Sequence, residues 1–423
     1  MLIFSEKKES TIRRDAMAAI AVMASLWLLA ISFTAGAANR EGSDTVPVHP
    51  VDELTVSILT CSPGSEIYEL CGHAALRIRD SKSDVVWNYG VFDFNEPNFV
   101  YRFVKGESDY MLAGAFFNDF MYQYVNRGSR VVEQVLNLNA EEKLRLAQRL
   151  WEESLPQNRT YRYNYVKDNC ATRILDRIEE TADAKLIYPD TLYFPTFRRE
   201  MMNYHGNYPW YQFGIDLALG EDLDLPLNGR EDMFVPMVMN KKLESTFLSD
   251  GRKLVSSENV IFEGSNDVVL PPTPWWRTPA FLFWLIFSAV AVMAVSRVKS
   301  RAAWKTVYAV WFTLIAAAGA VVTFLVFVSS HEATSPNMFI FWMNPLQIIV
   351  PIAVLFSRLR KIGIAIAVWN TIILLWQSTA ILFSGRGAQP AFLPIMLTTL
   401  LLSAMYAYSA YKEKKGKKLR NSK

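Results

Sequence analysis

The chain has few of the residues on which simple functional assignments rest. Among 423 residues there are three cysteines and four histidines, and the net charge is only +3. This near balance of charge, without a basic tract interleaved with aromatic residues, argues against nucleic acid as a partner. No internal repeat and no low-complexity tract occurs. Apolar residues, in contrast, make up 51% of the chain.

The N-terminus has the pattern of an export signal. Basic residues between Lys7 and Arg14 precede the apolar run AMAAIAVMASLWLLAISFTAGA, which ends at Ala37 in small residues. This order predicts cleavage after Ala37, and the length of the run leaves an uncleaved anchor as the alternative. Both interpretations place the following residues outside the cytoplasm.

Five apolar segments begin at Pro279, each long enough to cross a bilayer as a helix. They cover about residues 279–296, 305–329, 338–357, 361–384 and 390–410. The connections SRVKSRAAWK and SRLRK are basic, as is the tail YKEKKGKKLRNSK, whereas SSHEATSPN and SGRGAQP carry little positive charge. Because basic loops stay in the cytoplasm, residues 38–275 are predicted to lie outside and the C-terminus inside.

The soluble part has the pattern of an α+β domain. Alternating side chains predict strands at 54–60, 73–79 and 85–94. A helix is predicted in NAEEKLRLAQRLWEES, where Asn139 and Glu142 form a capping box, and strands followed by helices indicate α+β. The predicted parts are a signal or anchor at 1–37, an extracytoplasmic domain at 38–275, a five-helix membrane domain at 276–412 and a basic cytoplasmic tail at 413–423.

Cys170 lies in YRYNYVKDNCATRILDRI, where extended chain passes into a helix. Four apolar residues from Ala171 to Ile178 follow the i, i+3, i+4, i+7 spacing of one helix face. Asn169 or Asp168 is the expected N-cap. Cys170 then falls in or beside the first turn, where the helix dipole favours a thiolate. The alternative is a small buried hydrophobic residue.

A nucleophilic thiol needs a base, which is usually a histidine. His73 opens the predicted strand in CGHAALRIRD, directly after a glycine that permits close approach. His49 lies in an expected linker, and His205 lies in a turn-like segment where a structural hydrogen bond is expected. His73 is therefore the preferred base, with a solvated histidine as the alternative, and His331 in an outward loop is the second candidate.

A histidine that opens a strand, a polar residue on the next strand and NC at a helix start resemble the permuted papain-like fold. Lecithin:retinol acyltransferases and NlpC-like proteins have this arrangement. The stretches CGHAALRI, WNYGVFDF, YNYVKDNCATRILD and SSHEATSPNMFIFWMNPL are more closely similar to the Lnb family. These are bacterial thiol-type lipoprotein N-acyltransferases, in which a periplasmic domain precedes five membrane helices. The resemblance implies a papain-like α+β domain followed by an all-α membrane domain.

The resemblance also implies roles for individual residues. Cys170 corresponds to the nucleophile and His73 to the base. The third polar position falls on the strand after His73, where Asn88 is the candidate that orients the imidazole. Relatives outside the Lnb family often have a second histidine at this position, where this sequence has Asn88 or Tyr89. Tyr89 is therefore the alternative candidate for this role.

Substrate contacts are expected near this pair. Arg173, one turn past Cys170, is a candidate for a lipid phosphate, with a solvated helix face as the alternative. The aromatic run at 99–124 is either core or a surface that enters the lipid interface. The other candidates are Tyr89, Asn169 and His331.

Cys61 and Cys71 flank the stretch SPGSEIYEL. In an oxidising compartment they are expected to form a disulfide worth about 3 kcal/mol, with two free thiols as the alternative. The bond would leave Cys170 as the single free thiol.

The resemblance implies a thiol acyltransferase. This enzyme would cross the inner membrane several times and have its catalytic domain in the periplasm. The acyl donor would be a phospholipid, and the acceptor would be the α-amine of a diacylated lipoprotein. The acyl chain would pass between them through a Cys170 thioester. No cofactor is expected. One alternative is a periplasmic thiol amidase or peptidase that cuts the cell wall, although such enzymes rarely need five spans. The other is a non-enzymatic envelope scaffold.

The topology can be tested with alkaline phosphatase fusions. A fusion near Asp250 is expected to be active and a fusion after Lys423 inactive, because the charge of the loops places these positions on opposite sides of the membrane. Phosphatase activity is compared in cells that contain equal amounts of the two fusions. The reverse pattern would overturn the predicted orientation.

Overall fold

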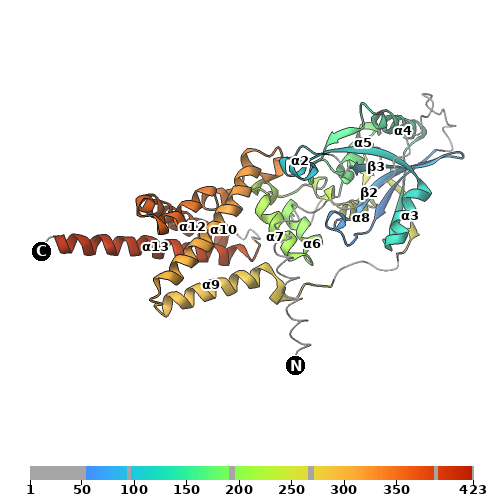
Figure 1. Ribbon diagram of the computed structural model, residues 1–423. Helices are drawn as coiled ribbons and strands as arrows, with labels where there is room; N and C mark the ends of the chain where they lie inside the picture. The colour runs from blue at the N-terminus through green and yellow to red at the C-terminus, as the bar shows by residue number, and fades with distance from the viewer. Residues whose placement is uncertain (1–53, 93–96, 190–195, 265–270, 385–388, 422–423) are drawn as a thin grey trace. The chain divides into compact units, whose positions relative to one another are not determined.

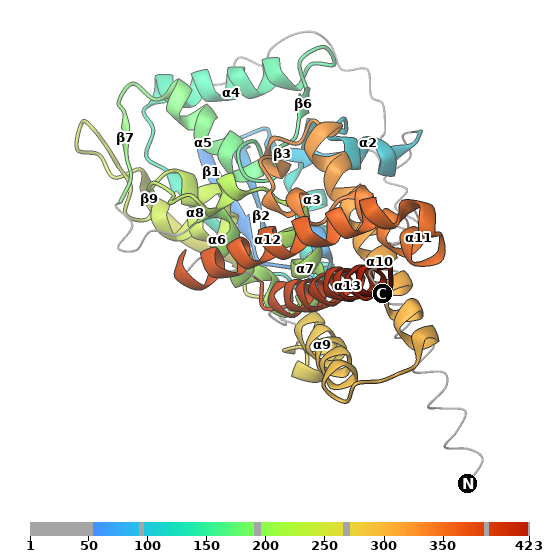
Figure 2. The same cartoon turned by 90° about the vertical axis from the view of Figure 1, so that its left-hand side faces the viewer.

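The structure is a computed structural model with two compact units (Figures 1 and 2). It describes residues 54–92, 97–189, 196–264, 271–384 and 389–421. The predicted export signal, cleavage after Ala37 and His49 lie outside these ranges. Described residues up to Asn207, with Leu225–Pro271, form the first unit, and Tyr208–Asp224 with the residues from Pro272 form the second. The first unit contains a β-sheet and helices and the second is helical, which confirms the predicted fold class.

An antiparallel sheet of seven described strands forms the centre of the first unit. Its spatial order is β6-β4-β3-β2-β1-β5-β9, so β1 and β2 are central. The three predicted strands correspond to β1, β2 and β3. The bounds are β1 Thr55–Cys61, β2 His73–Arg79, β3 Asp84–Val91, β4 Asp109–Phe116, β5 Val131–Leu136, β6 Thr160–Arg162 and β9 Val255–Phe262.

Different helices cover the two faces of this sheet (Figure 1). Side chains alternate along a strand, so Ile58 of β1 belongs to the core cluster that contains side chains of the helices at 140–154, 170–181 and 236–243. Leu59 belongs to the cluster that contains side chains of the helix at 117–127. Six of the seven residues of β1 are buried, because the strand is covered on both faces. The helices of this unit are α2 Phe99–Lys105, α3 Phe117–Arg127, α4 Ala140–Ser154, α5 Cys170–Thr181, α6 Phe197–His205 and α8 Pro236–Leu243, and a small sheet pairs β7 Leu186–Ile187 with β8 Phe247–Leu248.

The predicted helix starts are confirmed. In the capping box of α4, Asn139 Oδ1 accepts the Glu142 amide at 2.9 Å, and Glu142 Oε2 accepts the Asn139 amide at 2.6 Å. α5 begins at Cys170, with Asn169 as its N-cap. The predicted apolar face of α5 is fully buried in the core, and it consists of Ala171, Ile174, Leu175 and Ile178.

Glu142 also joins segments that are far apart in the sequence. Its carboxylate accepts the Asp183 amide at 3.0 Å and the two terminal nitrogens of Arg252 at 2.8 and 2.9 Å. The side chain is fully buried. These donors, with the Arg252 hydrogen bond as the largest cause, lower the pKa of Glu142 to about 2.

The second unit has the character of a membrane domain. Its helices are α7 Pro209–Ala218, α9 Pro279–Val295, α10 Arg301–Phe327, α11 Ile349–Leu355, α12 Arg360–Ser384 and α13 Phe392–Asn421. Four described segments are apolar and long enough to cross a membrane, namely Arg301–Phe327, Met338–Leu355, Arg360–Thr379 and Phe392–Ser409. α9 is a shorter apolar helix of 17 residues. The predicted total of five spans therefore stays a prediction.

Residues 208–224 pack within this unit, although they lie in the stretch predicted as extracytoplasmic domain. Trp210 Nε1 donates to the Arg277 carbonyl at 2.8 Å, and Asn337 Nδ2 donates to the Leu217 carbonyl at 3.0 Å. The chain thus enters the helical unit once through α7 before it reaches α9.

Residues 338–355 are not the single helix that their apolar sequence predicts. Two 3₁₀ turns, η7 (Met338–Phe341) and η8 (Pro345–Ile348), precede α11. Gly319 of α10 makes room for this break, because a Cβ there would lie 2.3 Å from the backbone nitrogen of Asn344. The helix is therefore interrupted at the point where the backbone near Asn344 closely approaches that of α10 at Gly319.

Side chains donate hydrogen bonds to backbone carbonyls of the broken segment. Trp369 Nε1 of α12 donates to the Phe341 carbonyl at 2.8 Å, and Gln377 Nε2 of α12 donates to the Met338 carbonyl at 2.9 Å. An unpaired carbonyl in apolar surroundings is costly, so irregular backbone persists there only with such partners.

Glu142→Gln is expected to lower the free energy of unfolding by about 2–4 kcal/mol, because Arg252 loses its buried charged partner. The pKa of Glu142 is lowered in the folded state, so its stabilisation is complete above the ordinary carboxyl pKa and is lost as the pH falls toward 2. Thermal unfolding of the detergent-purified protein at several pH values measures this. The exposed neighbour Glu141→Gln is the matched control, and a loss that is equal for both variants would contradict the argument.

Candidate active site

A buried amide sets the position of Cys170 at the start of α5. Asn169 Oδ1 accepts the amide hydrogens of Ala171 at 2.9 Å and Thr172 at 3.1 Å. Asn169 Nδ2 donates to the carbonyl of Phe234 at 2.9 Å. Cys170 as a residue is partly exposed, and the cap fixes the position of its backbone.

His73 is the first residue of β2, as predicted. It follows Gly72, whose φ of 76° is in the left-handed region. A Cβ at Gly72 would lie 2.6 Å from the Cys61 carbonyl oxygen and 3.2 Å from the Met237 sulfur. Glycine therefore lets the chain enter β2 at this close approach and places His73 at the end of the strand.

Asn88 and Tyr124 hold the His73 ring from two sides. His73 Nε2 lies 3.1 Å from Asn88 Oδ1 on β3. The ring is nearly parallel to that of Tyr124 on α3, with centroids 6.5 Å apart. Because the amide oxygen accepts from Nε2, Nδ1 is the ring nitrogen left to face the sulfur. Asn88 therefore has the geometry expected of an orienting residue.

Cys170 and His73 each shift the pKa of the other. Burial by itself raises the pKa of Cys170, but the charge and hydrogen bond of His73, with the amides of Ala74 and Ala171, outweigh burial and lower it. Burial by itself lowers the pKa of His73, but the charge and hydrogen bond of Cys170 and the bond from Asn88 raise it. Together these shifts favour a thiolate beside an imidazolium, the state in which a cysteine attacks carbonyl carbon.

Arg173 is committed to ion pairs, which corrects its prediction as a phosphate-binding or solvated residue. Its Nε and Nη2 donate to the two carboxylate oxygens of Asp168 at 2.5 and 2.8 Å, and Nη1 donates to Glu153 at 3.3 Å. Its guanidinium carbon lies 3.5 Å from the Tyr161 ring centroid. Arg173 therefore fixes the first turn of α5 through these ion pairs.

Tyr89 is also a structural residue, in contrast to its prediction as an orienting or substrate-binding residue. It is fully buried, and its hydroxyl donates to Glu153 Oε2 at 2.7 Å. Arg177 Nε lies 3.0 Å from the same oxygen. Because successive strand residues face opposite ways, Asn88 and not Tyr89 points toward His73.

The remaining candidates have different environments. Asn169 is buried and its side-chain oxygen caps the helix, so it positions Cys170. His331 lies in the second unit, at the N-cap of the 3₁₀ turn Glu332–Thr334, and its contact with substrate stays a prediction. His205 is fully buried and makes the expected hydrogen bond, to Tyr165.

The expected disulfide is wrong, because Cys61, Cys71 and Cys170 are all free thiols. Cys61 is buried in the cluster between the sheet and α3. Cys71 Sγ instead lies 3.4 Å from the hydroxyl of Tyr165 in the loop before α5. Their spacing in the sequence does not bring the two thiols into disulfide geometry.

Two contributors to the site have no signal in the sequence. Ala74 acts through its backbone amide, which any residue other than proline supplies. Tyr124 is one of many aromatic residues in the run at 99–124, and nothing in that pattern marks it as the neighbour of His73.

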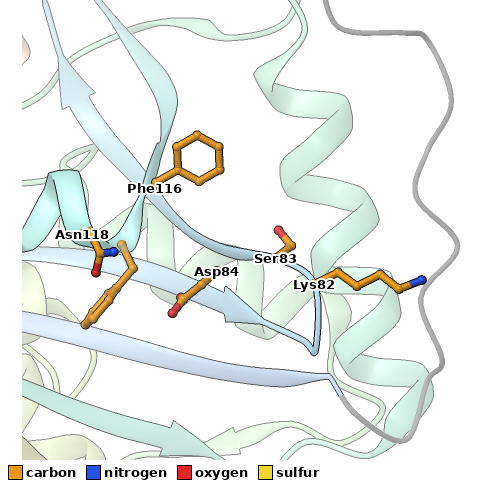
Figure 3. A pocket seen from close by; sticks show the side chains of 6 residues that line it. Lys82, Ser83, Asp84, Phe116 and Asn118 are labelled. Carbon is orange, nitrogen blue, oxygen red and sulfur yellow. The ribbon is translucent and has the colours of Figure 1, made fainter.

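The residues that line a pocket at the turn between β2 and β3 do not include Cys170, His73 or Asn88 (Figure 3). The turn is at the opposite end of the hairpin from His73. Asp84 in this pocket is paired with Arg77 at 2.6 Å, and Lys82 and Ser83 point in different directions (Figure 3). The lining residues are Lys82, Ser83, Asp84, Phe116, Phe117 and Asn118. Among the described residues, no group of three or more histidine, cysteine or acidic side chains is arranged to hold a metal ion.

Fold and site together define a class of protein: an α+β domain with a cysteine–histidine pair at a helix start, joined to apolar helices of membrane length. The family model for the Lnb N-terminal periplasmic domain matches residues 49–203, and that for the Lnb transmembrane domain matches residues 272–414. The chain belongs to the Lnb family, which confirms the resemblance. No curated protein and no solved structure matches it significantly.

Family membership places the N-terminal domain in the periplasm and the helical domain in a membrane. It also supports a place among lipoprotein-modifying enzymes.

Cys170 is expected to react with iodoacetamide at lower pH than an ordinary thiol, because His73 stabilises its thiolate. In His73→Ala the midpoint of the pH–rate profile should rise, since burial then acts without the opposing charge. Mass spectrometry of labelled peptides gives the rate at each cysteine. Burial raises the pKa of Cys61, so this thiol is the internal control. Identical profiles for wild type and His73→Ala would contradict the ion pair.

Proposed function

We propose that the protein is an apolipoprotein N-acyltransferase of the inner membrane, multi-pass and with its active site in the periplasm. It moves an acyl chain from a phospholipid, through a Cys170 thioester, to the α-amine of a diacylglyceryl-cysteine lipoprotein. One observation carries this proposal: a chain of the Lnb family brings together Cys170, His73 and Asn88. These residues supply a nucleophile, an acid–base group and a group that orients it.

The first half of the reaction uses the ion pair directly. The Cys170 thiolate attacks the carbonyl carbon of a phospholipid ester, and the C–O bond of the tetrahedral intermediate breaks. The His73 imidazolium gives its proton to the departing glycerol oxygen. The products are a lysophospholipid and a Cys170 thioester, with His73 now neutral.

The start of α5 supports stabilisation of the oxyanion. Asn169 takes the amides of Ala171 and Thr172 with its side chain and that of Arg173 with its carbonyl. Among the described residues of the first turn, the backbone amide of Cys170 is the one that Asn169 does not accept. It can donate to the oxygen on which negative charge develops.

The second half restores the ion pair. The lipoprotein amine attacks the thioester, the C–S bond breaks, and Cys170 leaves as a thiolate. Neutral His73 accepts the proton that the new amide nitrogen loses. The thiolate needs no proton to leave, so one histidine serves both halves.

Transfer to an amine requires that water be kept from the thioester. Both substrates are lipids, and the surface of the first unit suits contact with them. In the aromatic run at 99–124, Tyr101, Phe103, Phe116 and Tyr122 are between 40% and 70% exposed. Exposed aromatic side chains of this kind favour a membrane interface.

Cys170→Ala and His73→Ala are each expected to lower acyl transfer by about 10³-fold or more, and the double variant should be little worse, because the two residues act as a unit. Cys170→Ser should be nearly inactive, since an alcohol beside one imidazole does not ionise readily. Asn88→Ala should lose about 10- to 100-fold, because it only orients the base. The assay follows a labelled acyl chain from phospholipid to a diacylglyceryl-cysteine peptide.

The exposed Asn118→Ala is the matched control for Asn88→Ala, and membrane insertion is checked for every variant. With labelled phospholipid and no acceptor, a hydroxylamine-sensitive acyl group should accumulate on Cys170. Full activity in Cys170→Ala would rule out the thioester mechanism. In cells, mass spectrometry of lipoprotein N-termini should show triacylated forms only when the active protein is present. Lipoprotein N-termini that stay diacylated both with and without the active protein would contradict the proposal.

A further inference from the structure

Tyr163 follows β6 and precedes the loop that leads into α5. The residue is partly exposed, and no described residue forms a hydrogen bond with its hydroxyl. Its ring stacks on that of Tyr110 of β4, with centroids 4.2 Å apart and planes inclined by 21°. This stack accounts for the ring, but a phenylalanine would form it equally well. The hydroxyl therefore requires a separate explanation.

A short hairpin places Tyr163 beside Cys170. The Asn164 amide donates to the Asp168 carbonyl at 3.0 Å, and the Asp168 amide donates to the Asn164 carbonyl at 2.9 Å, so these two residues form an antiparallel pair. In such a pair the residue before one partner lies across from the residue after the other, so Tyr163 lies across from Asn169. Cys170 is the next residue in the chain. Tyr163 and Cys170 also pack against the same core cluster, which contains the apolar face of α5.

The surroundings of Tyr163 keep its phenol neutral. Burial raises the pKa of this phenol well above its usual value, and the charges of Tyr110 and Cys170 add to the rise. The effect of Cys170 agrees with the position of Tyr163 across the hairpin. The phenol therefore keeps its proton while Cys170 is a thiolate, and a neutral phenol has one hydrogen to donate.

The proposed reaction has a use for such a donor. Both of its halves pass through a tetrahedral intermediate whose oxygen carries negative charge, and donors fixed in advance stabilise that charge. The Cys170 amide is one donor. The amides of Ala74 and Ala171 bond to the Cys170 sulfur instead, where they stabilise the thiolate. A second donor beside Cys170 therefore has to come from another group, and the phenol of Tyr163 has the required hydrogen.

We propose that Tyr163 is a catalytic residue whose hydroxyl donates a hydrogen bond to this oxyanion. When the Cys170 thiolate adds to the ester carbon, the π electrons of the carbonyl move to its oxygen, which accepts from Tyr163 Oη and from the Cys170 amide. When the C–O bond breaks, the electrons return and form the thioester carbonyl. The same bonds form and are released when the amine attacks the thioester. Tyr163 keeps its hydrogen throughout, so His73 still carries out every proton transfer assigned to it. This inference rests on the proposed acyltransferase function.

Tyr163→Phe keeps the ring stack and removes only the hydroxyl. Two rates are measured: release of p-nitrophenol as p-nitrophenyl butyrate acylates Cys170, and transfer of a labelled acyl chain from phospholipid to a diacylglyceryl-cysteine peptide. Each should fall by about 10²-fold or more, the loss typical of one oxyanion donor. The pH–rate profile for alkylation of Cys170 by iodoacetamide should not change, because alkylation displaces iodide from a saturated carbon and forms no oxyanion. A purely structural role of Tyr163 would slow alkylation as well.

Tyr110→Phe is the matched control, since it removes the phenol from the other ring of the same stack and should change each rate by less than about twofold. Equal losses in the two variants, or no loss in Tyr163→Phe, would overturn the role of Tyr163.

A wild type that reacts with p-nitrophenyl butyrate but not with phospholipid would count against the acyltransferase function, and the butyrate rates alone would then decide the role of Tyr163. If Tyr163→Phe does not insert in the membrane, the same rates are measured for Tyr163→Leu. Slower acylation with unchanged alkylation supports the oxyanion donor, and equal or absent losses overturn it.

Discussion

The site depends on the buried side-chain amide of Asn169. Asn169 caps α5 with its oxygen, which accepts two backbone amides, and its nitrogen donates to the carbonyls of Tyr165 and Phe234. All of the ordinary hydrogen-bonding capacity of the side chain is therefore used. The same residue fixes the helix that carries Cys170, the loop that precedes it and a segment from later in the chain. Loss of any of these bonds inside the domain would leave an unpaired polar group, so the arrangement is held as a unit.

The sheet supplies the second constraint, which concerns how His73 meets Cys170. α5 packs on the face that contains Ala74, whereas His73 has the strand parity of Ala75 on the opposite face. The two side chains can meet because His73 is the first residue of β2, at the end of the strand, where the positive φ of Gly72 turns the chain. Two residues further into the strand, at the position of Ala75 on the opposite face, the sheet itself would separate base from nucleophile.

Local patterns predicted much of this architecture. Periodicity located the helix after Cys170, a capping box located α4, and alternation located the central strands. Features that depend on distant partners were not predictable. Tyr89 is bonded to Glu153, 64 residues away, and Arg173 contacts the same carboxylate. The break near Asn344 depends on the absence of a side chain at Gly319 of another helix, and a hydropathy pattern carries no information about such an approach.

The polar side chains of the helical unit point to a division of labour. Trp369, Gln377 and Gln347 donate to backbone carbonyls of the broken segment, so their hydrogen bonds stabilise the fold of the unit. The pair with mutually shifted pKa values, Cys170 and His73, belongs to the first unit. For the proposed transfer between two lipids this division is reasonable. A group with a perturbed charge needs the fixed dipoles of a folded polar domain, whereas its substrates leave the bilayer only at a cost that grows with each exposed methylene. The helical unit meets the second requirement by keeping the chemical domain attached to the membrane, and the polar domain can then hold an ion pair that the bilayer interior would not tolerate.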